Sequence, residues 1–129
     1  MSDSELDKIL AEKSRRLVVE HASHVVELTD TNFEKVVGGP KLAFVDFWAT
    51  WCGPCKTMEP VISRLAAKLG SSVAFGKLNV DEHSAIATRY EVQSIPTFMM
   101  FRDGKPIDAV IGTMQESALE LRIRKAAGV

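Results

Sequence analysis

Apolar residues form an almost unbroken run at residues 42–49, and the only charged residue inside it is Asp46. A run of this kind, partly β-branched and aromatic, is typical of a central strand that is covered on both faces. Over residues 54–69 the spacing changes, because apolar side chains recur there every three or four residues. They are Met58, Val61, Ile62, Leu65 and Leu69. The pattern predicts a buried strand followed directly by an amphipathic helix.

The rest of the chain alternates between the same two patterns. We predict further strands at residues 25–28, 73–80, 97–101 and 106–111, and further helices at residues 33–37, 84–90 and 117–126. A turn at residues 102–105 joins the last two strands into an antiparallel hairpin. Strand, helix and strand, followed by a hairpin and a helix, predict an α/β domain whose central mixed sheet is flanked by helices on both faces.

Local signals refine the helix ends. Residues 29–32 offer capping side chains for the helix that begins at Phe33. Gly70 fits a C-terminal cap for the long helix. Pro60 is expected to kink that helix without ending it, because the apolar spacing continues beyond the proline.

The only two cysteines, Cys52 and Cys55, stand in the sequence Trp-Cys-Gly-Pro-Cys-Lys, directly after the predicted central strand. Two thiols at this spacing can form a disulfide with each other and pass two electrons to a partner. Gly53 allows a tight turn and Pro54 suits the first turn of a helix, which places Cys52 at the helix N-terminus. Unpaired N–H groups and the helix dipole stabilise a thiolate there. We therefore predict that Cys52 is the nucleophile and that Cys55, one turn further in and more buried, is the resolving thiol.

Half of a four-ligand zinc site, or two unrelated buried cysteines, are the alternative interpretations of this pair. Zinc would need two more Cys or His ligands, and the only nearby candidates are His21, His24 and His83. His21 and His24 could form a metal pair of their own, but two histidines in an extended segment are usually solvated. The order of strand, cysteine motif and helix favours a redox site without a metal.

Charge and length narrow the class of protein. Sixteen basic and seventeen acidic residues give a net charge of −1, so no general attraction to nucleic acid or to an anionic membrane is indicated. The 129 residues suit one domain with a hydrophobic core. Neither a secretory signal nor a membrane span is expected, so we predict a cytoplasmic protein, in which a lone cysteine pair is catalytic more often than structural.

Several motifs together resemble the thioredoxin family, in the family's order and at its spacing, over about residues 25–126. They are Val45-Asp46-Phe47-Trp48-Ala49, Trp51-Cys52-Gly53-Pro54-Cys55-Lys56, Lys77-Leu78-Asn79-Val80-Asp81, Ile95-Pro96-Thr97 and Gly112. The resemblance implies a thioredoxin fold and a protein-disulfide reductase. It also implies that no cofactor is needed beyond the redox-active disulfide between Cys52 and Cys55.

Asp46 is unusual because a carboxylate inside a central strand costs several kcal/mol of desolvation unless it is neutral or functional. The resemblance implies that Asp46 is a buried proton acceptor, which helps to deprotonate Cys55, and that Lys77 is its electrostatic neighbour. Burial would raise the pKa of Asp46 toward the neutral range that this role requires. The alternatives are a solvated carboxylate at a strand edge and an exposed strand lysine.

A second loop is expected to complete the site. A proline that leads into a central strand is unusual, because it cannot donate a hydrogen bond to the sheet. The resemblance implies that Pro96 is cis and faces the cysteines, which leaves the backbone of Ile95 free to pair with an extended substrate. The substrate-binding surface would be apolar. Its predicted members are Trp51, Gly53, Pro54, Ile95, Pro96, Thr97 and Gly112, with Trp48 either on this surface or in the core.

The resemblance also implies the partners. Electrons would come from a thioredoxin reductase and pass to target proteins with disulfides, such as ribonucleotide reductase, peroxiredoxins and sulfoxide reductases; a monomer is expected. An oxidase or isomerase is the second possibility, and the Gly-Pro dipeptide between the cysteines argues against it. A binding module without enzymatic activity is the third, and it leaves Asp46, Pro96 and both cysteines unexplained.

The resemblance does not extend to the N-terminus. We predict an N-terminal extension at residues 1–24 and the thioredoxin domain at residues 25–129. Residues 3–17 can form a helix with a narrow apolar stripe. The extension could contact a partner, a second copy or a membrane, but a frayed segment or a helix packed on its own domain is favoured.

Overall fold

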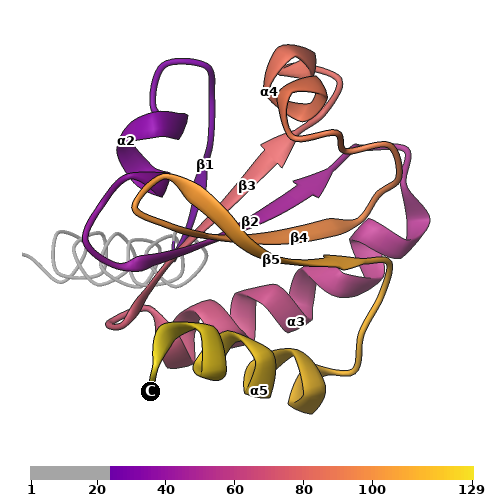
Figure 1. Ribbon diagram of the computed structural model, residues 1–129. Coiled ribbons are helices and arrows are strands. Elements are labelled where there is room, and N and C mark those ends of the chain that lie inside the picture. The colour runs from indigo at the N-terminus through magenta and orange to yellow at the C-terminus, as the bar shows by residue number, and fades with distance from the viewer. Residues whose placement is uncertain (1–23) are drawn as a thin grey trace, which may run out of the picture.

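The computed structural model describes residues 24–129, in which five strands form one sheet that is flanked by helices (Figure 1). The strands are β1 (Val25–Glu27), β2 (Leu42–Trp48), β3 (Val73–Asn79), β4 (Thr97–Arg102) and β5 (Lys105–Ile111). The helices are α2 (Phe33–Val37), α3 (Gly53–Leu69), α4 (Ser84–Arg89) and α5 (Glu116–Ala127). The helix predicted at residues 3–17, and His21, lie outside the described residues.

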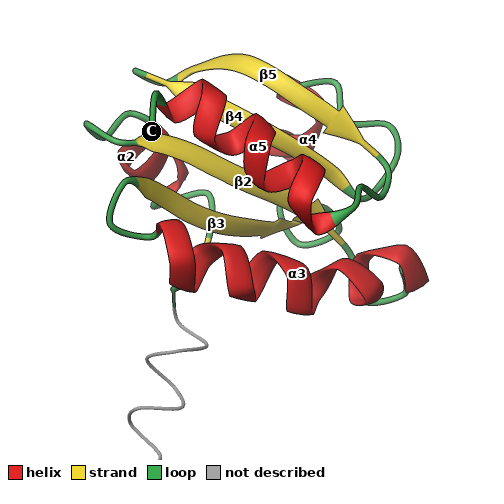
Figure 2. Ribbon diagram, turned by 90° about the horizontal axis from the view of Figure 1, so that it is seen from below, coloured by secondary structure: helices red, strands yellow, loops and turns green. Residues whose placement is uncertain are grey.

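The sheet is mixed, with the strand order β1-β3-β2-β4-β5. β3 pairs in parallel with both β1 and β2, whereas β4 pairs antiparallel with β2 and with β5. Helices α3 and α5 lie side by side on one face (Figure 2), and α2 and α4 cover the other face. The predicted α/β class, the mixed sheet and the C-terminal hairpin are therefore confirmed.

β2 is central, and its alternating side chains enter two separate cores. Leu42 and Phe44 join the core beneath α3 and α5, whereas Ala43, Val45 and Phe47 join the core on the side of α2 and α4. This two-sided burial explains why β2 reads as a continuous apolar run. By the same alternation, Asp46 shares a face with Phe44 and points toward α3.

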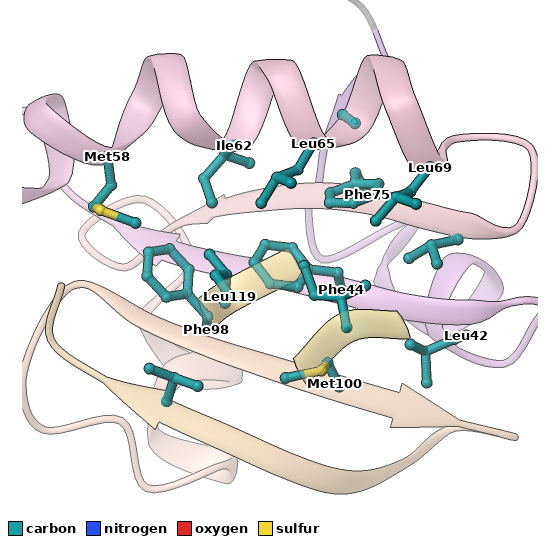
Figure 3. Close-up of a cluster of buried hydrophobic side chains, with 14 residues drawn as sticks. Leu42, Phe44, Met58, Ile62, Leu65, Leu69, Phe75, Phe98, Met100 and Leu119 are labelled. Atoms are coloured by element: carbon teal, nitrogen blue, oxygen red, sulfur yellow. The ribbon is translucent and has the colours of Figure 1, made fainter. Parts of the chain in front are cut away.

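The core beneath α3 contains the apolar stripe that the sequence predicts. Met58, Ile62, Leu65 and Leu69 point from α3 toward the sheet (Figure 3), where they meet aromatic rings from three strands. Those rings belong to Phe44, Phe75 and Phe98. The stripe continues beyond Pro60 and α3 ends at Leu69, with Gly70 as its C-cap, so the predicted extent of the helix is confirmed.

Two details of the chain differ from, or add to, the prediction. Asn32 is the N-cap residue of α2, but its side chain makes no capping bond to the helix; it accepts from the N–H of Thr29 and donates to the carbonyl of Glu27. The predicted capping by side chains is therefore wrong, because this side chain closes the loop after β1 instead. The hairpin turn consists of Asp103 and Gly104, both at positive φ, which matches the right-handed twist of the flanking strands.

Gly76 on β3 provides a test of the packing in the core on the side of α2 and α4, because it lies against Leu28 of that core. A Cβ at Gly76 would lie 2.6 Å from Cδ1 of Leu28, whose side chain is itself buried. We expect Gly76→Ala to lower the free energy of unfolding by about 1–3 kcal/mol, as overpacking does, measured by urea denaturation. The double variant Leu28→Ala/Gly76→Ala should lose less than the two single losses together, since the smaller side chain removes the clash. Strict additivity would show that Leu28 is not the obstacle.

Candidate active site

The cysteine pair lies where β2 ends and α3 begins. Cys52 is the N-cap residue of α3, with an extended backbone, and its Sγ accepts a hydrogen bond of 3.2 Å from the N–H of Cys55. Pro54 occupies the first turn, as predicted for a proline that needs no donor there. Cys52 and Cys55 form a disulfide, with their Cα atoms 5.3 Å apart. The two sulfurs are thus held at the positive end of a long helix.

The two cysteines do not differ in burial. Each is 4% exposed in the disulfide form, so the greater burial expected for Cys55 is not seen. They differ in surroundings: Cys52 sits at the helix end beside exposed Trp51 and Gly53, whereas Cys55 lines a small cavity. Cys52 and Cys55 form a small buried cluster with Ala49, and Ile95 packs against this cluster, which helps to explain why a cysteine at a helix end is still covered.

Asp46 lines the same small cavity as Cys55. The cavity has a volume of about 30 Å³, which is enough to admit a water molecule. Asp46 is 7% exposed, and its Oδ1 has no hydrogen-bond partner among the described residues. Burial raises the pKa of Asp46 from 3.8 to about 7; the charge of Lys77 lowers this pKa and the charge of Glu59 raises it, both by less. The carboxyl group can therefore take up or release a proton near neutral pH.

Lys77 is the residue directly opposite Asp46 on β3. Its Nζ lies 5.0 Å from the centre of the Trp48 ring and 4.0 Å from the carboxylate of Glu27 on β1. Trp48 is partly buried and packs beside the cysteines, so it borders both the core and the cavity. The lysine is thus held near Asp46 by an aromatic face and a second carboxylate.

Trp51 is 69% exposed, yet its position is defined. Its Nε1 donates a hydrogen bond of 2.8 Å to Oδ2 of Asp81, and the loop that carries Asp81 is held by Oδ1 of Asn79. Asp81 belongs to a motif that the sequence analysis quoted, but nothing in the sequence pairs it with Trp51. The contact joins the cysteine loop to the end of β3.

The second loop lies beside the cysteines. The Ile95–Pro96 bond is cis, the hydroxyl of Thr97 donates to the carbonyl of Ser94 at 2.6 Å, and the N–H of Gly112 donates to the carbonyl of Pro96 at 2.8 Å. Gly112 has a φ of 92°, a conformation that favours glycine. The predicted residues of this loop and Gly112 are therefore brought together at one end of β4 and β5.

Ile111 is an exposed apolar residue beside this loop that the sequence analysis did not name as a candidate. It is 72% exposed, it pairs with Thr97 across β4 and β5, and it directly precedes Gly112. Exposed large apolar side chains are common singly, but this one adjoins a loop that contacts the disulfide. In the sequence, Ile111 reads only as the last residue of a strand, so no local signal distinguishes it.

Within residues 24–129, no three His, Cys, Asp or Glu side chains are grouped so that they could hold a metal ion. In the same range, no helix is long and apolar enough to cross a membrane.

Comparison with known proteins decides the family. Residues 24–125 match the family model of thioredoxin. A thioredoxin of Staphylococcus aureus is 51% identical over 89 residues, which cover 68% of this chain and 84% of the relative. A thioredoxin of Staphylococcus epidermidis is 49% identical over 89 residues, with the same two coverages. The chain belongs to the thioredoxin family.

Solved structures agree with this assignment. The thioredoxin of Malassezia sympodialis has a TM-score of 0.74 and 39% identity, over 80% of this chain and 90% of that structure. The resemblance inferred from the motifs is therefore confirmed. With its Cys52–Cys55 pair, this member of the thioredoxin family is a thiol–disulfide oxidoreductase that reduces protein disulfides by thiol–disulfide exchange.

The raised pKa of Asp46 predicts a pH-dependent cost in stability. The folded protein holds the Asp46 proton up to about pH 7, whereas an unfolded chain releases it near pH 3.8, so this group lowers stability progressively as the pH rises between those values. In the oxidised protein, Asp46→Asn should therefore raise the free energy of unfolding little below pH 4 and by as much as about 4 kcal/mol above pH 7.

Urea denaturation at pH 5 and pH 8 would measure this effect. Asp103→Asn is the matched control, since it removes the same charge at an exposed turn where Asn tolerates the positive φ. A gain in stability from Asp46→Asn that is equal at the two pH values would contradict a buried, titrating carboxyl group.

Proposed function

We propose that Cys52 attacks the target disulfide and that Cys55 resolves the intermediate. The Cys52 thiolate breaks the target S–S bond and forms a mixed disulfide, and the released target sulfur takes up a proton. Cys55 then loses its proton, attacks Sγ of Cys52, and releases the second target thiol. The target gains two electrons and two protons, and the Cys52–Cys55 disulfide is formed. The position of Cys52 at the helix N-cap, with an N–H directed at its Sγ, supports this order.

Asp46 is the proposed acceptor of the Cys55 proton, with Lys77 as its electrostatic neighbour. Both side chains line the cavity that Cys55 lines, and a water molecule in that cavity would connect the carboxyl group and the thiol. A pKa of about 7 suits a group that must accept a proton and later return it to solvent near neutral pH. Asp46 shares this cavity with Cys55, and Cys52 does not line it. This observation supports Cys55, rather than Cys52, as the thiol that Asp46 deprotonates.

The proposed target-binding surface surrounds the disulfide. Its members are Trp51, Gly53, Pro54, Ile95, Pro96, Thr97 and Gly112, and we add Ile111. Trp51, Gly53 and Pro54 are exposed, and nothing lies within 4 Å of a Cβ placed on Gly53, so a target chain has room there. The backbone of Ile95 makes no hydrogen bond to another described backbone group, which leaves it able to pair with an extended segment of the target.

The proposal also includes the electron donor, the targets and the oligomeric state. We expect a thioredoxin reductase to reduce the Cys52–Cys55 disulfide, and disulfide-bearing enzymes such as peroxiredoxins to be targets. A monomer suits this role, because each target must reach the same exposed surface. The cytoplasmic location and the separate N-terminal extension expected from the sequence stay predictions.

Trapping would test the roles of the cysteines. Cys55→Ser should accumulate a mixed disulfide with oxidised insulin, because no second thiol is present to resolve it, whereas Cys52→Ser should accumulate at least about tenfold less. Non-reducing electrophoresis with mass spectrometry would measure both adducts, and dithiothreitol should release them. Equal trapping by the two variants would remove the assignment of Cys52 as nucleophile.

A matched pair of variants would test the target-binding surface. Ile111→Ser and Leu121→Ser remove side chains that are 72% and 70% exposed, but Leu121 lies on α5 away from the cysteine loop. We expect Ile111→Ser to lower kcat/KM for insulin several-fold, through lost apolar contact, and Leu121→Ser to leave it unchanged. Reduction of a small disulfide should change little in either variant. A similar loss of insulin reduction in both variants would show that Ile111 has no special part in binding.

A further inference from the structure

Glu59 stands one helical turn after Cys55 on α3. Residues four apart lie on the same face of a helix, so the carboxylate of Glu59 and the sulfur of Cys55 are directed to the same side. Glu59 is an exposed residue, yet it lines the cavity that contains Asp46. It therefore joins the buried carboxyl group to the protein surface.

The charged groups around Asp46 lie on two neighbouring elements, β3 and α3. Lys77 faces it from β3, and Lys56 and Glu59 line the cavity from α3. On the other side, the residue opposite Asp46 on β4 is Phe98, which has no charge. Glu27 on β1 enters only through Lys77, at 4.0 Å from its Nζ.

The side chains of Lys77 and Glu59 differ in their interactions with other residues. The ammonium group of Lys77 also interacts with the carboxylate of Glu27 and with the Trp48 ring. The side chain of Glu59 has no hydrogen bond or ion pair with another residue in the described range. Its charge is thus not offset by a bonded partner, and it acts on the cavity through space.

We propose that Glu59 is a positioning residue for thiol–disulfide exchange, which acts through Asp46 by opposing the charge of Lys77 across the cavity. The inference rests on the proposed role of Asp46 as proton acceptor. A negative charge at Glu59 makes a second negative charge at Asp46 less favourable, so Asp46 keeps its proton to a higher pH. Lys77 has the opposite effect. Burial is the main reason that the pKa of Asp46 lies near neutral pH, and the two charges adjust that pKa in opposite directions.

The sign of each effect can be measured on Asp46 itself. In the oxidised full-length protein, the carboxyl ¹³C signal of Asp46 would be followed by NMR as a function of pH. Glu59→Gln keeps the shape and removes the charge, and it should lower the midpoint of the Asp46 titration by about half a pH unit. Lys77→Met should raise the midpoint, and Glu59→Asp should retain most of the wild-type value.

The control is Glu34→Gln on α2, which removes one exposed carboxylate on the other face of the sheet. It should leave the midpoint unchanged. The shift caused by Glu59→Gln should also shrink in 1 M salt, because the Glu59 carboxylate is open to solvent. An unmoved midpoint in Glu59→Gln, with a midpoint that does move in Lys77→Met, would overturn the inference while leaving the proposed function intact.

A second measurement connects the titration to the reaction. The pH profile of insulin reduction should move to lower pH in Glu59→Gln, and the same substitution should have no further effect in an Asp46→Asn background. If the NMR midpoint moves but Asp46→Asn has the wild-type rate profile, Asp46 is not the proton acceptor. That outcome would overturn the proposed role of Asp46, and with it the influence of Glu59 on the reaction.

Discussion

The burial of β2 between two layers of helices is the constraint on which the active site depends. Because β2 is covered on both faces, its end is a rigid point from which the cysteine loop and α3 depart. Side chains of α3 that enter the core fix that helix against the sheet, and so fix its N-terminus. The sulfur of Cys52 therefore meets the unpaired N–H groups of α3 in one geometry rather than several.

The same burial controls the protonation of Asp46. The carboxyl group of Asp46, on the α3 side of β2, is removed from water. This burial is the largest cause of the rise of its pKa to about 7. Burying an ionised Asp46 lowers the stability of the folded protein, and the proposed role of Asp46 as a proton acceptor at neutral pH would account for this cost. Lys77 lowers the pKa of Asp46 and Glu59 raises it, so charges on both β3 and α3 act on this group.

The proposed target-binding surface lies toward the side of the sheet opposite β1. β4 and β5 run antiparallel to each other, which brings the loop before β4 and the end of β5 to the same place. The hydrogen bond from the N–H of Gly112 to the carbonyl of Pro96 joins these two segments. Ile95 packs against the cluster that contains the cysteines. Trp51 is held on the other side by Asp81. An apolar surface of this kind suits targets that differ in sequence, since it uses contact area and backbone pairing rather than one specific charge.

The sequence by itself determined the elements and most of the chemistry. The apolar run of β2, the helical stripe of α3 and the hairpin were readable because their spacing reports which faces are buried. The cysteine motif was readable because its residues are adjacent in the chain. Contacts between residues far apart in the chain could not be read from the sequence, and only the tertiary structure decided them. They are the contacts of Trp51 with Asp81, of Thr97 with Ile111, and of Glu59 with the cavity that Asp46 lines. The turn of the Asn32 side chain away from α2 and the equal burial of the two cysteines also depend on packing. A local pattern shows which residues are buried, but the neighbours across the sheet, and therefore the charges that act on a buried group, are set by how the chain folds back on itself.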